Sequence, residues 1–343
     1  MTTRRLELTR AQILAHRQTV GALAERLAPG ADSLRRAAWA GLQDSVPRAA
    51  LLSIHARVEG TEPSTWEDAS LVQLWGPRFS AYVVTADDRG VFTLGRLPDD
   101  DRGRRFAEEV AIRLDAFLDG RRMSYGEAGR ALGVHPNALR YAAPTGRVLI
   151  RWEGARQPTV WTVPPPEIDL GEARLELARR YLHVFGPTTP AAFGEWAGIA
   201  RARARAAFDA LLGTLTPVRT AIGDAWILAR DEPTFRAPAG RPAAARLLPS
   251  GDAYFLLQGA DRELLVPDSD HRRELWTTRV WPGGVLAGGE LVGTWRRAAA
   301  NVRIQLWRRL SRTERDALES EAESLPLPGV HGRILAGWEN AAD

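Results

Sequence analysis

The chain has 343 residues, long enough for several domains, and its 45% hydrophobic and 26% charged residues are ordinary for a soluble globular protein. It contains no cysteine and no lysine, which excludes disulfides, thiolate metal sites, lysine Schiff-base chemistry and the lysine-dependent phosphate loop of NTPases. The net charge of +4 is carried by arginine, which suits phosphate contacts, but a surplus this small is weak evidence for nucleic acid binding.

The first hundred residues predict an irregular winged-helix unit, in which three helices precede a two-stranded ribbon. Between the second and third helices stands the polar cluster Gln43-Asp44-Ser45, followed by Pro47. One interpretation is structural, with Ser45 capping the next helix. The other is a functional site at a helix junction. The expected helices are residues 10–27, 33–42 and 47–58, and the expected strands are 81–84 and 91–94 around a turn at 88–90.

Two later segments share one plan, in which three helices separated by tight glycine turns precede a two-stranded ribbon. A single unit of this kind also fits a generic α+β packing module, but two in tandem favour DNA binding. The second unit, 101–166, has expected helices at 104–118, 124–132 and 135–141 and strands at 148–152 and 158–163 around Gly154. The third unit, 167–235, has helices at 172–185, 190–197 and 201–212 and strands at 215–218 and 225–228.

The last hundred residues predict a different architecture. Prolines at 164–166 form a stiff linker between the second and third units, and residues 236–246 form another linker. Short apolar runs and the hairpin turn Gly288-Gly289 then indicate a small β-barrel over 240–300. An acidic amphipathic helix at 311–325 lies in the tail, 301–343. We therefore expect an α+β fold of three tandem winged-helix units, with the first spanning 1–100, followed by a small C-terminal β-barrel.

Several further signals are missing from the sequence. No apolar run reaches the ~18 residues of a membrane span, and the N-terminus lacks the apolar core of a signal peptide. No two histidines stand at a metal-ligand spacing, and no GxGxxG follows a strand-like run. We expect a cytoplasmic protein with no metal, no nucleotide or other cofactor, and no membrane partner.

A series of small motifs in the last third resembles the winged-helix DNA glycosylases of the AlkZ and YcaQ type. The motifs are LLP at 247–249, DAY at 252–254, DR at 261–262, LLVP at 264–267 and VGTWR at 292–296. The resemblance extends over nearly the whole chain. It implies a nucleoid-associated monomer that binds double-stranded DNA, alkylated or crosslinked. It implies hydrolysis of the N-glycosidic bond of N7-alkylated purines, including bulky genotoxin adducts, for repair or self-resistance.

The same resemblance points to the cluster at 43–45. Family members that act on DNA carry Gln-x-Gln or Gln-x-Asp after Gly-Leu and before a proline turn, so Gln43 takes the first place and Ser45 the second. Ser45 departs from the family pattern, and so does Tyr82, which stands where the family has a histidine. For a purine already charged by alkylation, Gln43 would hold the attacking water and Asp44 would accept its proton. Without a lysine, the enzyme would not cleave the strand.

Other residues are expected to contact DNA through charge or stacking. Tryptophans and Tyr82 suit stacking on a displaced base or adduct, although tryptophan is also a common core residue, and His55 fits a half-buried structural role equally well. Two other functions stay open: a non-catalytic DNA-binding regulator or damage sensor, and a binder that sequesters a small aromatic toxin. The expected DNA contacts are Trp39, Arg48, His55, Trp75, Arg78, Tyr82, Arg140, Arg203 and Arg296.

Overall fold

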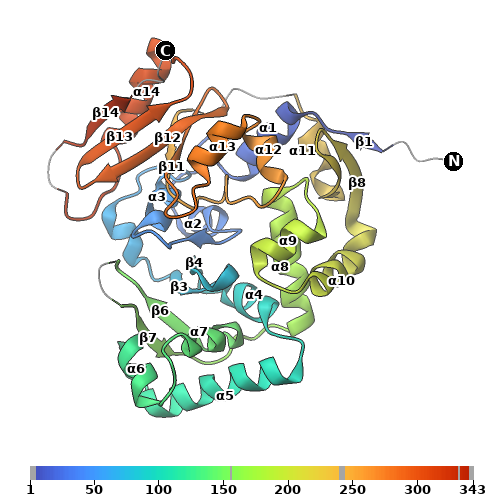
Figure 1. Cartoon of the computed structure of the whole chain (residues 1–343), viewed down its shortest axis with the longest axis vertical. Coiled ribbons are helices and arrows are strands. Elements are labelled where there is room, and N and C mark those ends of the chain that lie inside the picture. The colour runs from blue at the N-terminus through green and yellow to red at the C-terminus, as the bar shows by residue number, and fades with distance from the viewer. Residues whose placement is uncertain (1–4, 155–156, 239–243, 331–332, 340–343) are drawn as a thin grey trace.

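A computed structural model describes residues 5–154, 157–238, 244–330 and 333–339. Within these ranges the fold is mixed α and β, with sheets of three, five and six strands. Figure 1 shows the five-stranded sheet at one end of the molecule, helices α5–α7 at the other, and α8–α10 along one side. No helix in these ranges is long and apolar enough to cross a membrane.

The N-terminal segment differs from the predicted ribbon. The strand expected at 91–94 is wrong, because Val91 and Phe92 lie buried in helix α4 (Arg89–Thr93). A short apolar run fits a strand or a buried helical turn equally well, so periodicity alone could not separate them. The partner of β4 (Ala81–Thr85) is instead β3 (Leu71–Trp75). The elements that precede them are α1 (Arg10–Val20), α2 (Ala31–Ala37), β2 (Leu42–Gln43) and α3 (Ala49–His55).

The first and second predicted units share one six-stranded sheet of order β2-β4-β3-β6-β7-β5. A single β-pair, Gln73 with Ile150, joins β3 to β6 and so links the two halves of the sheet. The second half contains β5 (Met123–Ser124), β6 (Val148–Arg151) and β7 (Thr159–Thr162), covered by α5 (Asp101–Leu118), α6 (Tyr125–Ala131) and α7 (Ala138–Ala142). The predicted turn of this ribbon includes residues 155 and 156, which lie outside the described residues.

The third predicted unit has its expected helices and ribbon. These are α8 (Leu170–Phe185), α9 (Pro190–Ala197), α10 (Arg201–Leu211), β8 (Leu215–Thr220) and β9 (Gly223–Leu228). Thr189 caps α9 through its hydroxyl, and Pro190 occupies the first turn, where its missing N–H costs nothing. Strand β1 (Leu6–Glu7) adds to β8 in parallel, so a segment near the start of the chain extends the sheet of this unit. Helix α11 (Glu232–Arg236) follows, and residues 239–243 of the predicted linker lie outside the described residues.

The C-terminal region forms an open sheet, so the predicted barrel is wrong. The sheet order is β10-β11-β12-β13-β14, and its two edge strands do not pair with each other. The apolar run at 254–257, which the barrel prediction included, lies in a loop, and residues 249–282 form loops and two short helices, α12 (Asp261–Leu265) and α13 (Ser269–Leu275). The strands are β10 (Arg246–Leu248), β11 (Gly283–Ala287), β12 (Glu290–Ala298), β13 (Asn301–Leu306) and β14 (Leu335–Glu339); the predicted tail helix is α14 (Arg312–Glu323).

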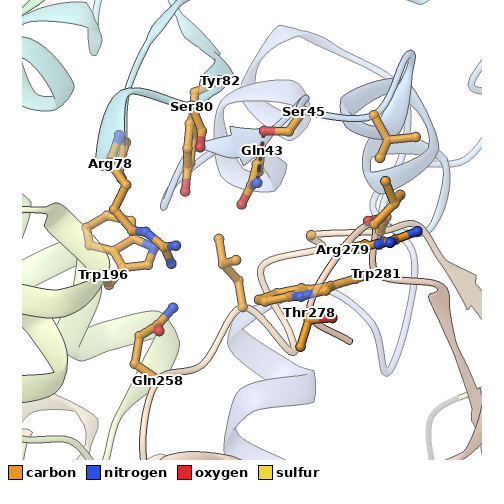
Figure 2. Close-up of a pocket in the computed structure, with 16 residues that line it drawn as sticks. Gln43, Ser45, Arg78, Ser80, Tyr82, Trp196, Gln258, Thr278, Arg279 and Trp281 are labelled. Atoms are coloured by element: carbon orange, nitrogen blue, oxygen red, sulfur yellow. Dashed lines mark hydrogen bonds between the residues drawn. The ribbon is translucent and has the colours of Figure 1, made fainter. Parts of the chain in front are cut away.

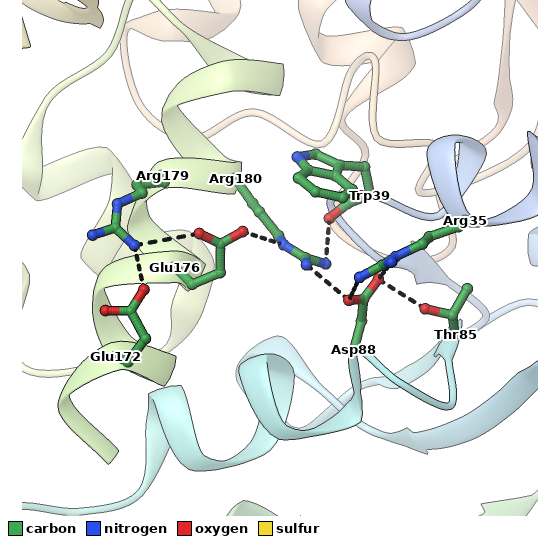
Figure 3. A network of polar contacts seen from close by, with 8 residues as sticks. All are labelled: Arg35, Trp39, Thr85, Asp88, Glu172, Glu176, Arg179 and Arg180. Carbon is green, nitrogen blue, oxygen red and sulfur yellow. Dashed lines mark hydrogen bonds and ion pairs between the residues drawn. The ribbon is translucent and has the colours of Figure 1, made fainter. Parts of the chain in front are cut away.

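An ion-pair network around the buried Asp88 joins α2, the end of β4 and α8 (Figure 3). Asp88 accepts hydrogen bonds from Arg180 at 2.8 Å, from Arg35 at 2.9 Å and from the Thr85 hydroxyl at 2.8 Å. Although burial opposes ionisation, the hydrogen bonds from Arg180 and Arg35 hold the pKa of Asp88 well below its ordinary value. We call this cluster the Asp88 junction. It fixes the third predicted unit against the first.

Candidate active site

A cavity of ≈ 330 Å³ lies between strands β2 and β4, the C-terminal end of α9, and the segment 250–281. This is the size of a small ligand pocket. In Figure 2, Gln43, Ser45, Ser80 and Tyr82 lie on one side of the cavity, and Gln258, Thr278 and Trp281 lie on the opposite side. The remaining lining residues are Val46, Pro77, Arg78, Trp196, Ser250, Gly251, Leu256, Arg279 and Val280.

Strand geometry decides which residues of the polar cluster face the cavity. Leu42 and Gln43 form β2, and the ladder continues because the Asp44 N–H donates to Ala81 O at 2.8 Å. Successive side chains of a strand point to opposite faces of the sheet. Gln43 and Ser45 therefore line the cavity, whereas Leu42 and Asp44 are buried, at 1% and 0% exposure.

The carboxamide of Gln43 has one hydrogen-bonded end and one free end. Its Nε2 donates to Ser45 Oγ at 2.9 Å. Among the described residues, no group donates a hydrogen bond to its Oε1. Gly251, with a positive φ of 74°, passes directly over this side chain, where an added Cβ would lie 3.2 Å from Gln43 Cδ. The loop that follows β10 therefore presses on the carboxamide. The hydrogen bond to Ser45 leaves Oε1 as the end of the carboxamide that is free to accept.

Asp44 does not line the cavity. One of its carboxylate oxygens accepts the Ala50 N–H at 3.0 Å, and the other accepts Gln73 Nε2 at 2.6 Å. Burial raises the pKa of this carboxyl to about 7. Asp44 thus ties the start of α3 to β3 behind the cavity, and this placement does not support its predicted role as a base acting on a water in the cavity.

Tyr82 faces the cavity from β4, directly opposite Gln43 in the antiparallel register. Its ring lies against Gly76, where a Cβ would come within 2.8 Å of Tyr82 Cγ, so only glycine leaves room for the ring. Burial raises the pKa of the Tyr82 hydroxyl above its ordinary value. The residue at the position of the family histidine is therefore a protonated phenol at neutral pH.

Two arginines, Arg78 and Arg279, line the cavity with exposed side chains. Neither guanidinium forms a hydrogen bond or ion pair with another residue in the described ranges. Arg78 adopts a left-handed conformation, with a φ of 55°, in the short turn between β3 and β4. Such strain in a residue other than glycine often marks a functional position. Both cations are free to meet a polyanion at the cavity.

The two tryptophans predicted to contact DNA, Trp39 and Trp75, pack against other residues of the protein. Trp39 lies outside the cavity, with the Arg180 guanidinium 4.0 Å from its ring, next to the Asp88 junction. Trp75 is buried, 2% exposed, in the core beneath α5, and its ring lies 5.9 Å from the guanidinium of Arg140. The structure therefore places both tryptophans, together with Arg140, in packing between elements.

The other predicted contacts also lie away from the cavity. Arg48 stacks over Trp66 at 4.6 Å, and Arg203 donates to Asp99 at 2.6 Å. Arg296 donates to the carbonyl of Val280 at 3.1 Å and so supports the loop that carries Arg279.

His55 lies at the end of α3, against α14, where its Nε2 is 3.2 Å from Ser324 Oγ. Burial and the nearby Arg26 and Arg246 lower its pKa to about 3. A neutral, enclosed imidazole is a packing group, so this position does not support the expected contact with DNA.

Of the twelve predicted site residues, the cavity therefore brings together Gln43, Ser45, Arg78 and Tyr82. Sequence reasoning missed Trp196, Gln258, Arg279 and Trp281, which come from segments remote along the chain and carry no local motif. Among the described residues, no group of three or more histidines, aspartates or glutamates could hold a metal ion.

The sequence model of a family described as "DNA glycosylase AlkZ-like" matches residues 35–326. The structure is similar to that of the Streptomyces sahachiroi DNA glycosylase AlkZ, with a TM-score of 0.78 and 19% sequence identity, covering 97% of this chain and 100% of that one. At this identity the structural likeness shows a shared fold. No curated protein matches the sequence.

Proposed function

Because the chain belongs to the AlkZ-like DNA glycosylase family, we propose that it removes N7-alkylated purines from double-stranded DNA, with Gln43 as its main catalytic residue. The observation that carries this proposal is the Gln43 carboxamide, which faces the cavity with its Nε2 held by Ser45. Its carbonyl oxygen is thereby left free as an acceptor. An oriented oxygen dipole of this kind is the group that the reaction needs.

The reaction needs little general-acid catalysis. Alkylation at N7 gives the purine a positive charge, so the base departs with the electron pair of the C1′–N9 bond and becomes neutral. Positive charge develops on the sugar, where the oxygen dipole of Gln43 stabilises it. The same oxygen accepts a hydrogen bond from the attacking water and aims it at C1′. The proton of that water passes to solvent, and the product is an abasic site in an intact strand.

Ser45 acts in this proposal as a positioning residue. Its hydroxyl accepts from Gln43 Nε2 at 2.9 Å and so favours the orientation in which the carbonyl oxygen, rather than the N–H groups, faces the sugar. A second glutamine or an aspartate at this place would reach further into the cavity. Serine leaves more space there, so a bulky adduct or a crosslinked base fits as well as a small methyl lesion. Repair or self-resistance against a bulky genotoxin would follow from that space.

The duplex would be held by the tandem units. We assign winged-helix character to residues 1–100, 101–166 and 167–235, the first with the catalytic cluster, and supporting roles to 240–300 and 301–343. The exposed guanidinium groups of Arg78 and Arg279 would neutralise phosphates on either side of the damaged nucleotide. The chain would act as a monomer, because one copy carries the whole cavity.

The test is release of free base from duplexes that contain one N7-alkylguanine, followed by alkali to reveal the abasic site. Gln43→Ala should slow release by roughly 100- to 1,000-fold, the typical loss for one preorganised dipole, with DNA affinity unchanged. Ser45→Ala should lower kcat by a smaller factor and leave KM unchanged. Full release by Gln43→Ala would reject its catalytic role. DNA binding by the wild type without any base release would favour a damage sensor instead.

A further inference from the structure

Two buried hydrogen-bond donors in the wall of the cavity have no partner. The Trp196 indole N–H and the Gln258 Nε2 are both buried without a hydrogen bond, and both side chains line the cavity. Trp196 is only 1% exposed. A buried donor without a partner costs free energy, so such groups are rare unless a ligand completes them. Other buried atoms in the described residues are unpartnered too, but none of them lines this cavity.

These donors come from elements that converge on Tyr82. Trp196 lies at the end of α9, whose C-cap Gly198 packs so closely on the turn before β4 that a Cβ there would be 3.1 Å from Arg78 Cα. The Trp196 indole N–H lies close enough to the Tyr82 hydroxyl to lower the pKa of that phenol as a hydrogen-bond donor does, although it does not reach full hydrogen-bond geometry. Gln258 belongs to the segment between β10 and α12. Figure 2 shows it across the cavity from Gln43, with its amide nitrogen directed toward the Trp196 side.

We propose that Tyr82, Trp196 and Gln258 form a donor wall that recognises a carbonyl oxygen of the damaged base. This inference rests on the proposed function and deepens it, since it names the part of the substrate that is read. The phenol, the indole N–H and the amide all offer hydrogens, and none of the described carboxylates lines the cavity to compete for them. A purine with a carbonyl at C6 offers an oxygen that accepts hydrogen bonds from the donor wall. A purine with an amino group at C6 instead places another hydrogen-bond donor against these donors. Guanine adducts are therefore selected over adenine adducts.

A phosphate oxygen of the DNA backbone could accept the same hydrogen bonds as a base carbonyl. The experiment must therefore separate the carbonyl from the phosphate. Duplexes carry a single N7-methylguanine or N7-methyladenine at the same position. For each, base release is measured with the ordinary sugar and equilibrium binding with a 2′-fluoro sugar that resists hydrolysis. The variants are Trp196→Phe, Gln258→Leu and Tyr82→Phe, each of which removes a donor while keeping most of the volume.

The matched control is Trp66→Phe. Trp66 is 4% exposed and also has a buried, unpartnered indole N–H, but it lies under Arg48 and Arg151, outside the cavity. The same chemical deletion is thereby made at a second site of similar burial. Each variant is first compared with the wild type by circular dichroism and thermal unfolding.

The wild type should prefer guanine in both assays. Each donor-wall variant should lower release of N7-methylguanine by roughly 5- to 150-fold, while release of N7-methyladenine changes by less than about threefold. Trp66→Phe should keep the preference. An unchanged preference in all three variants overturns the proposal. An equal loss on both bases, with a weaker salt dependence of binding, assigns the donors to a phosphate and also overturns it.

The two proposals fail in different ways. If the wild type releases neither base but binds the 2′-fluoro guanine duplex more tightly than the adenine one, the glycosylase substrate assignment fails and the donor wall stands. If the wild type releases both bases with no preference and the variants behave like it, the donor wall fails and the glycosylase substrate assignment stands.

Discussion

At both the Asp88 junction and the cavity, segments distant in sequence meet around arginine side chains. The arginines of the junction are paired with carboxylates, whereas those of the cavity are not, among the described residues. In the junction, Arg180 is buried and bonded to Asp88 and Glu176, and Arg35 shares the same carboxylate. At the cavity, the guanidinium groups of Arg78 and Arg279 are exposed and have no ion pair within the described ranges. Paired arginines hold the units together, whereas unpaired ones remain available to a polyanion. Arginine content alone does not separate the two roles; the presence or absence of a nearby carboxylate does.

The largest effect is expected from breaking the junction. Asp88→Ala leaves Arg180, with a side chain 4% exposed, with Glu176 as its one remaining ion-pair partner among the described residues. Removing one partner of a buried pair typically costs about 3–5 kcal/mol, so urea unfolding should show a loss of this size. Because folding lowers the pKa of Asp88, wild-type stability should also fall as the pH drops below about 4, the ordinary pKa of aspartate.

Asp224, which pairs with Arg5 and Arg219 at the surface, provides the control for the junction. Asp224→Ala should change stability by less than about 1 kcal/mol, as expected for a solvent-exposed ion pair. Equal losses in Asp88→Ala and Asp224→Ala would contradict the structural role given to the junction.

The second effect is a pH dependence of opposite sign near the cavity. Burial raises the pKa of Asp44 to about 7, so the folded protein binds this proton more tightly than the unfolded chain does. The resulting stability is complete below about pH 4 and is lost as the pH rises through 7, at up to ~1.4 kcal/mol per pH unit. Unfolding measured from pH 5 to 8 should show this slope in the wild type and not in Asp44→Asn. An identical slope in both proteins would remove Asp44 as its source.

The smallest effect concerns the unpaired arginines. Arg78→Ala and Arg279→Ala should each weaken duplex binding severalfold and reduce the slope of log affinity against log salt by about 1, because each removes one phosphate contact. Arg308, which is similarly accessible but paired with Glu314 at 2.6 Å, serves as the matched control, and Arg308→Ala should leave both quantities unchanged. An unchanged salt slope in Arg78→Ala and Arg279→Ala would mean that the duplex does not approach this face.

Local patterns predicted the regular elements well where period, caps and glycine turns agreed. The helices and ribbon of the third unit follow the expected order, with Thr189, Pro190 and Gly198 marking the ends of α9. The prediction failed where the signal was short. Val91 and Phe92 suit either a strand or a buried helical turn, and only their packing against neighbouring segments selected the helix. The barrel failed for a similar reason, because apolar loop residues between β10 and β11 resemble strands in sequence.

The sequence by itself determined that Gln43 and Ser45 belong together, since residues two apart share one face once the chain is extended. Only the tertiary structure decided that the chain is extended there, because β4 pairs with β2 and turns Asp44 into the core. It also decided what lies opposite these residues, since Trp196 and Gln258 reach the cavity from segments more than a hundred residues away. A local pattern records which side a residue faces relative to its neighbours in the chain. It carries no record of the partners that folding brings to that side, because those contacts form between segments with no shared periodicity.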